Sequence, residues 1–309
     1  MVSRRQALQV AGTAVAAAFA GCSSDVLGNE PAGPRHELHV DRIATEPVRW
    51  ALYEPDEGEP FGDPARDALD AILPEGRHRT VGYAPVGEGN YVEHEGRYFR
   101  TESFVSGRAA VDRPVVRAEP IAESSVPEDA LLVDSLAQPS ARVVKVLHSH
   151  SVTDGASGSA ELLRGDAYVM VRPAERESRL VDDLDGKVVT MTDDGGSPYR
   201  IEVRHETVTP PEYTTFAVAV AESEAAFHEV VLASAVDADL TTTPLSEDAT
   251  ELLDRAIGRN GHRENGDPSE GFEALLHGLG FNVGEAETGR ILWYGESLFR
   301  ASYYVNPGD

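Results

Sequence analysis

The chain has little of several residue types, and each shortage limits what the protein can be. It contains one cysteine, Cys22, in 309 residues, so no disulfide can form within it and packing must stabilise the fold. It contains two lysines, Lys145 and Lys187, and no run rich in lysine and arginine. Nucleic-acid binding needs a basic surface against the phosphates, so no nucleic-acid partner is expected. After residue 21 no apolar run approaches the roughly 20 residues that a membrane-spanning helix requires.

The signature motifs of common enzyme classes are also missing. There is no dinucleotide-binding glycine motif, Walker loop, Gly-x-Ser-x-Gly turn, His-Glu-x-x-His motif or cysteine pair for zinc. Scattered serines, histidines and aspartates occur in any chain of this length and indicate no triad. No catalytic residue and no cofactor is therefore predicted, and His262, like the other scattered histidines, is expected on a solvated face.

Acidic residues are abundant instead. Asp and Glu number 53 against 27 Lys and Arg, for a net charge of −26, and they are spread along the whole chain. This distribution favours a solvated acidic surface that works in concentrated salt, where self-repulsion is screened. The alternative is a surface selected to bind cations or basic partners.

The N-terminus has the order of charges and apolar residues typical of a secretory signal. Arg4 and Arg5 precede an apolar run over residues 8–20, and no acidic residue occurs before Asp25. Cys22 follows this run after Ala20 and Gly21. The segment resembles a twin-arginine export signal that ends in a lipobox, and the resemblance implies cleavage before Cys22 and a lipid on its sulfur. The expected location is the extracellular face of the cell membrane.

Three segments share a pattern in which a β-rich run meets a glycine-containing turn and returns through an aromatic residue and an arginine. They are predicted β-hairpins at residues 91–100, 188–200 and 291–300. Apolar stripes at helical spacing precede them, at residues 65–73, 132–137 and 249–257. Strand candidates precede these helices, at residues 48–53, 115–121 and 230–236.

The predicted fold is therefore α+β, with three related strand-helix-hairpin units, antiparallel sheets and helices on one face. Unit 2 has an insertion whose strand candidate covers residues 213–221. The predicted divisions are a signal peptide at 1–21, a lipidated flexible spacer at 22–45, and units at 46–112, 113–225 and 226–309. The export signal, lipobox and acidic composition resemble haloarchaeal surface lipoproteins, and the units resemble small α+β domains of unknown function in such proteins. This resemblance implies a setting and no activity.

One cluster invites a metal. If His148 and His150 lie on a strand, both imidazoles face the same side and could reach one ion with Asp154. The alternative, which we favour, is a polar turn after a helix that ends near Leu147, where histidine suits the helix C-terminus. No metal is predicted, and these three residues remain candidates.

Two further sets of residues have a functional and a structural interpretation. Arg100, Arg200 and Arg300 occupy equivalent places in the hairpins and could bind anions, but pairing with nearby carboxylates is the simpler expectation. Trp50 and Trp293 are expected to pack in cores or on sheets.

Two hypotheses for function follow. The first is a non-enzymatic binding or interaction module, held to the membrane by the lipid on Cys22, whose partner is an envelope protein or a small molecule. The alternative is an exported metal-dependent hydrolase centred on unit 2 at His148, His150 and Asp154.

Overall fold

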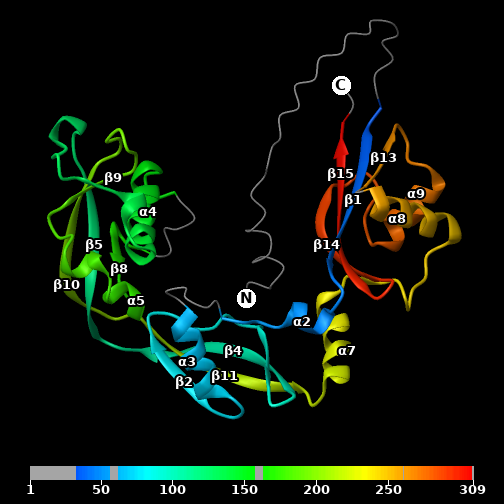
Figure 1. Cartoon of the computed structure of the whole chain (residues 1–309), viewed down its shortest axis with the longest axis horizontal. Coiled ribbons are helices and arrows are strands. Elements are labelled where there is room, and N and C mark those ends of the chain that lie inside the picture. The colour runs from blue at the N-terminus through cyan, green and yellow to red at the C-terminus, as the bar shows by residue number, and fades with distance from the viewer. Residues whose placement is uncertain (1–32, 56–61, 157–162, 260, 308–309) are drawn as a thin grey trace, which may run out of the picture. The chain divides into compact units, whose positions relative to one another are not determined.

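A computed structural model describes four stretches of the chain (Figure 1), which are residues 33–55, 62–156, 163–259 and 261–307. The described chain is mixed α+β with mostly antiparallel sheets, as the sequence predicts. It divides into two compact units. Of the described residues, the terminal unit comprises those within 33–52, 95–98 and 220–307, and the central unit comprises those within 53–94 and 99–219. Arg4, Arg5 and Cys22 lie outside the described residues.

The terminal unit is built on a five-stranded sheet in the order β12-β14-β15-β1-β13. Within this sheet β12 and β14 pair in parallel, and the other neighbouring strands pair antiparallel. Its elements in chain order are β1 (Arg35–Ala44), α2 (Pro47–Ala51), α7 (Glu224–Ala235), β12 (Ala238–Asp239), α8 (Glu247–Arg259), β13 (His262–Asn265), α9 (Glu270–Gly278), β14 (Glu287–Tyr294) and β15 (Ser297–Asn306).

Strand β1 lies inside this sheet, between β15 and β13, although residues 22–45 were predicted to be a flexible spacer. That prediction is wrong for residues 35–44. His36, Leu38 and Val40 are buried and alternate with more exposed neighbours. This period of two is the pattern of a half-buried strand, but a histidine at one of the three buried positions makes it inconspicuous in the sequence.

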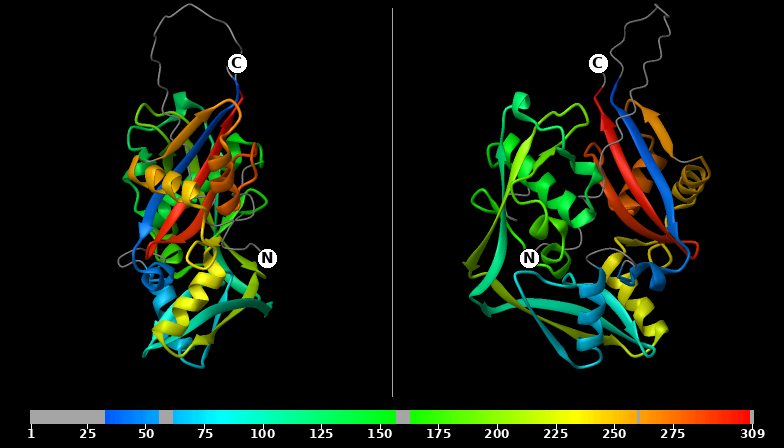
Figure 2. Two further views of the ribbon diagram at one scale, coloured as in Figure 1. Left: turned by 90° about the vertical axis from the view of Figure 1, so that its right-hand side faces the viewer. Right: turned by 60° about the vertical axis from the view of Figure 1, so that its left-hand side comes forward.

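Helices cover both faces of this sheet, whereas the sequence predicted helices on one face. Figures 1 and 2 show α8 and α9 together on one face. Leu253, Phe272 and Leu292 are fully buried in the core between them and the sheet. On the opposite face, Trp293 packs with partly buried residues of α2 and α7, among them Trp50. Both tryptophans therefore pack in a core, as expected.

Two of the predicted strands in this unit are helices. Residues 48–53 contribute most of α2, which Pro47 begins with the fixed φ that suits a first turn. Residues 230–236 form the end of α7, whose first turn is capped where the Ala226 N–H donates to Ser223 Oγ at 3.3 Å. In α7 the buried Phe227 and Val231 are four residues apart, so they share one helix face.

The central unit holds a six-stranded sheet in the order β6-β9-β10-β5-β8-β7 and a four-stranded sheet in the order β2-β11-β4-β3. Its elements are α3 (Gly62–Ile72), β2 (Arg77–Val81), β3 (Tyr91–His94), β4 (Arg97–Arg108), β5 (Val111–Pro120), β6 (Leu131–Leu132), α4 (Gln138–Val152), β7 (Leu163–Arg164), β8 (Ala167–Val169), α5 (Pro173–Arg176), α6 (Arg179–Asp182), β9 (Val188–Thr190), β10 (Tyr199–Val208) and β11 (Pro211–Ala221), with 3-10 turns at Glu123–Ser125 and Val133–Ser135.

Helix α4 begins later than the predicted helix at residues 132–137. Those residues form the second residue of β6, the second 3-10 turn and a short link. The α-helix starts beside Pro139, which suits a first helical turn. Val143, Val144 and Leu147 then continue the apolar stripe into the core of the six-stranded sheet. The predicted helices at 65–73 and 249–257 correspond to α3 and α8.

All three predicted hairpins are present, as β3–β4, β9–β10 and β14–β15. The predicted strands at 115–121 and 213–221 correspond to β5 and β11. Beside the second strand of each hairpin lies a further strand, which is β11, β5 or β1. The predicted order of strand, helix and hairpin along the chain therefore fails in the first and third units. There the neighbouring strand, β11 or β1, lies far in the sequence from the hairpin that it pairs with. Three repeated units are not confirmed.

Candidate functional site

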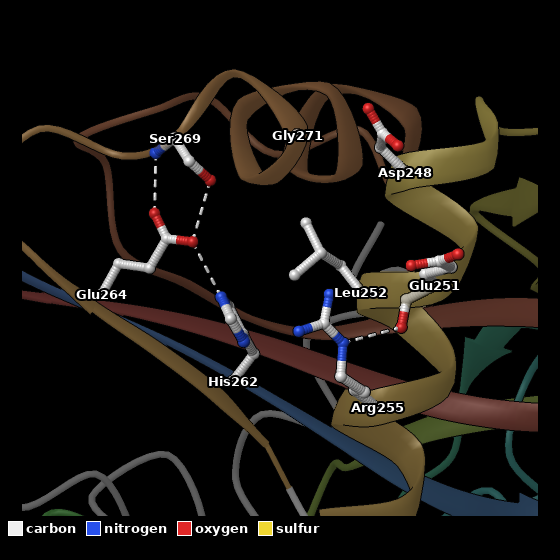
Figure 3. A pocket seen from close by; sticks show the side chains of 8 residues that line it. All are labelled: Asp248, Glu251, Leu252, Arg255, His262, Glu264, Ser269 and Gly271. Atoms are coloured by element: carbon white, nitrogen blue, oxygen red, sulfur yellow. Dashed lines mark hydrogen bonds and ion pairs between the residues drawn. The ribbon is translucent and has the colours of Figure 1, made fainter.

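A pocket of about 370 Å³ opens in the terminal unit (Figure 3). Three segments adjacent in the fold supply its walls, namely α8, β13 and the start of α9. The lining residues are Asp248, Glu251, Leu252 and Arg255 of α8, His262 and Glu264 of β13, and Ser269 and Gly271 at the start of α9. A Cβ on Gly271 would lie 3.3 Å from Leu252 Cδ1, so the glycine lets the two helices approach closely.

His262, Glu264 and Ser269 form one hydrogen-bonded group at the pocket wall. Because they are two apart on a strand, His262 and Glu264 face the same side. The carboxylate accepts from His262 Nε2 at 2.9 Å and from the Ser269 hydroxyl at 2.9 Å, both at Oε1. Its Oε2 accepts from the Ser269 N–H at 2.7 Å. Ser269 Oγ in turn accepts from the Phe272 N–H at 3.3 Å and caps α9.

These bonds determine the ionisation of Glu264. Partial burial acts to raise the pKa of its carboxyl group, but the hydrogen bonds from Ser269 and His262 outweigh burial and hold the pKa below its usual value. The His262 ring is further held edge-on to Phe272, with ring centroids 4.8 Å apart. The group is therefore an ordered carboxylate and imidazole with 20% and 19% of their side chains exposed.

The order of these contacts excludes a serine nucleophile activated by His262. In a catalytic triad the imidazole lies between hydroxyl and carboxylate and takes the hydroxyl proton. Here the carboxylate lies between the other two, and the Ser269 hydroxyl donates to Glu264. Ser269 therefore holds the start of α9, and the group is suited to positioning and binding.

Arg255 brings a positive charge to the same pocket. Its Nε donates to the Glu251 carbonyl one helical turn earlier, at 3.3 Å, which holds the side chain along α8. Figure 3 shows its guanidinium on the side of the pocket where His262 lies, while Asp248 lies nearer Gly271. The pocket thus presents a guanidinium and carboxylates within one opening.

The structure does not place His148 and His150 on one strand face, which is the geometry that a metal ion shared with Asp154 would need. His148 and His150 lie on α4 and not on a strand, and residues two apart on a helix point in very different directions. His148 Nδ1 is 2.8 Å from the Tyr199 hydroxyl, while His150 Nδ1 is buried and finds no hydrogen-bond partner in the described ranges. Asp154 follows the helix with φ of 52°. Among the described residues, no group of three or more His, Cys, Asp or Glu side chains could hold a metal ion.

The hairpin arginines Arg100, Arg200 and Arg300 are all exposed. Arg100 pairs with Glu102 at 2.6 Å, and Arg200 donates to the Gly186 carbonyl at 3.4 Å. Arg100 therefore makes the carboxylate pair that the simpler interpretation expects, whereas Arg200 contacts a backbone carbonyl.

The pocket was not predicted from the sequence, because His262 was expected on a solvated face. A usable signal was present: a His-x-Glu pair in alternation, followed by a serine that begins a helix. The pair alone would not have indicated Arg255, since its place beside the pocket depends on how α8 packs against β13.

Comparisons with known proteins add no relative. No family model matches the chain, and neither the curated proteins nor the solved structures include a match. Throughout the described ranges, each helix is too short or too polar to cross a membrane.

Proposed function

We propose that this chain is a surface lipoprotein whose folded part binds a small polar ligand outside the cell. The position of Cys22 carries the proposal. The one cysteine in the chain directly follows an apolar run that begins after Arg4 and Arg5, and Ser23, Ser24 and Asp25 provide a polar start for a tether. That order is what a processed, lipid-anchored export signal requires.

The pocket in the terminal unit supports binding over catalysis. Its serine donates to a carboxylate and caps a helix, so it is not positioned as a nucleophile. Its carboxylate and imidazole are held by hydrogen bonds before any ligand arrives, and such preorganisation reduces the entropic cost of binding.

The charges of the pocket indicate the class of ligand. The Arg255 guanidinium can bind a carboxylate in a forked geometry. Asp248 and Glu251 offer carboxylates to an amine or to hydroxyl groups. A small zwitterion, such as a free amino acid, or an acidic amino sugar matches this arrangement.

We also propose that the three sheets are related units, as the hairpin pattern predicts. The support is their common strand order, in which a hairpin is followed by a neighbouring strand and then by β2, β8 or β13. In two of them the neighbouring strand, β11 or β1, is supplied from elsewhere in the chain. Such an exchange explains why the pattern is incomplete along the sequence.

The anchor is tested with Cys22→Ser. The variant is expected to move from the membrane fraction to the medium, because the lipid would be its only attachment. Fractionation is combined with N-terminal mass analysis to separate cleaved from uncleaved protein. A cleaved variant that stays in the membrane fraction would contradict the anchor.

The ligand pocket is tested by thermal shift in multimolar potassium chloride with a panel of free amino acids and acidic amino sugars. A ligand at 100 times its Kd adds about 2.7 kcal/mol to the stability, which is a readily measured shift. Arg255→Gln is expected to abolish the shift. Arg259→Gln, one turn further along α8 and outside the pocket lining, is the matched control. No stabilisation by any compound, or equal loss in both variants, would refute this ligand class.

A further inference from the structure

Three arginines gather around Tyr83 in the central unit. Tyr83 lies just beyond the end of β2, Arg113 is on β5, Arg172 directly precedes α5, and Arg176 is the last residue of α5. Backbone contacts bring these segments together, and the charges of Arg113, Arg172 and Arg176 all act to lower the pKa of the Tyr83 hydroxyl.

The backbone explains how these segments meet. The Met170 N–H donates to the Pro114 carbonyl at 3.0 Å, which joins the end of β8 to β5 beside Arg113. Gly82 has φ of 90°, and a Cβ there would lie 2.5 Å from Val171 Cγ1. Only glycine therefore lets the end of β2 approach so close to the residue before Arg172.

The positive charge of the cluster is incompletely balanced within the described residues. In the part of the chain that the structure describes, Arg113 Nε is buried and has no hydrogen-bond partner, and Arg113 Nη1 donates to the Asp112 carbonyl rather than to a carboxylate. Burial lowers the pKa of Arg113, and repulsion by Arg176 lowers it further, against an opposing effect of the Asp112 charge. Arg172 is the member of the cluster that pairs with a carboxylate, since its Nη1 lies 3.5 Å from Glu175 Oε1.

The positive charges of the three arginines also act on the Tyr83 side chain. Burial raises the pKa of Tyr83, while the charges of the three arginines oppose that rise and Asp67 adds to it. The net pKa is raised, so the hydroxyl keeps its proton near neutral pH and can donate it in a hydrogen bond.

Such a cluster is unexpected in a chain with 53 acidic and 27 basic residues. Several arginines elsewhere in the described chain pair with carboxylates, as Arg117 does with Glu206 at 3.0 Å and Arg97 with Glu222 at 2.7 Å, whereas no such pair is formed by Arg113 or Arg176 within the described residues. Grouping like charges costs free energy, and a bound anion would offset that cost.

We propose that Arg113, Arg172 and Arg176, together with the Tyr83 hydroxyl, bind an oxyanion of the phosphate or sulfate class. Guanidinium groups match the oxygens of such anions in forked hydrogen bonds. The acidic surface does not prevent this in concentrated salt, because the screening length is about 3 Å at 1 M and only contacts inside the site count. The site is independent of the pocket in the terminal unit.

The test follows the Nε–H resonances of isotope-labelled arginines by NMR while the full chain is titrated at constant potassium chloride. The arms are inorganic phosphate, inorganic sulfate, glycerol phosphate and dextran sulfate. The first two report a free anion, and the last two report an anionic group on a larger molecule. We expect saturable shifts in at least one arm, including a shift of the buried Arg113 resonance.

Arg176→Gln is the main variant, because its side chain is exposed and the substitution should not disturb folding. Loss of one charge-assisted hydrogen bond corresponds to affinity weakened by about tenfold or more. The matched control is Arg179→Gln, three residues further on, which is exposed and pairs with Asp183 at 3.3 Å. Arg113→Gln is added if circular dichroism shows a native fold. Absence of saturable binding in every arm, or equal weakening in Arg176→Gln and Arg179→Gln, would overturn the proposal.

Discussion

Glu175 of α5 is expected to be one of the most sensitive positions for folding. Its side chain is fully buried, which is true of no other acidic residue that the structure describes, and both of its carboxylate oxygens accept hydrogen bonds. Oε1 accepts from the Tyr168 hydroxyl at 2.7 Å and lies 3.9 Å from Arg142. Oε2 accepts from the N–H groups of Val171 at 3.2 Å and Arg172 at 3.0 Å.

The magnitude follows from what each substitution leaves behind. Glu175→Ala strands three hydrogen-bond donors and removes the negative charge beside two arginines, so we expect a loss of about 3–5 kcal/mol, the range for breaking a buried ion pair. Glu175→Gln keeps one acceptor oxygen. Its amide NH₂ group replaces the other oxygen and therefore faces hydrogen-bond donors that it cannot accept from. Its expected cost is about 1–3 kcal/mol, the penalty for unsatisfied buried groups.

The assay is urea denaturation followed by circular dichroism in multimolar potassium chloride. Because buried pairs are poorly screened, the loss in Glu175→Ala should persist as the salt concentration is raised. Glu177→Gln, an exposed neighbour, should change stability by no more than about 0.5 kcal/mol. A cost below about 1 kcal/mol for Glu175→Ala would refute the reasoning.

Four further outcomes are expected. The lowered pKa of Glu264 means that its stabilising effect is present above pH 4.5 and is lost as the pH falls through its folded value, so Glu264→Gln should flatten the acid side of the stability curve measured by urea denaturation. Burial, with a further contribution from its carboxylate neighbour, raises the pKa of Tyr168, so stability should fall above pH 10.0, and less steeply in Tyr168→Phe. The melting temperature should drop as potassium chloride is diluted, because the net charge of −26 is then less screened; a constant melting temperature would contradict this. Replacing Arg4 and Arg5 together by Lys should leave precursor in the cytoplasm, and normal secretion would show that the export route differs.

Local features of the fold were predictable because short-range physics decides them. The hairpin at residues 291–300 and the helix at 249–257 carry their own turn residues, caps and periodicity. Ser246, for example, accepts the Ala249 N–H at 3.3 Å and starts α8. The segment at 230–236 was mispredicted because its β-branched run suggested a strand, whereas its apolar residues pack at helical spacing against the sheet.

The candidate sites were much less predictable. His148 and His150 were considered either on a strand or, as favoured, in a turn after a helix that ends near Leu147. Both predictions are wrong, because α4 continues to Val152 and places the two histidines on different sides of the helix. His262, Glu264 and Ser269 are close in sequence and could have been found. Arg255 joins them only through the packing of helix on sheet.

By itself, the sequence determined the acidic surface, the reliance on packing without disulfides, the α+β composition and the three hairpins, because each depends on composition or on neighbours within a few residues. The tertiary structure alone decided that β1 lies beside β15, at the far end of the chain, and that the end of β2 lies against the residue before Arg172. Such contacts depend on which distant segments pair, and pairing is selected by the burial of whole faces rather than by any local pattern.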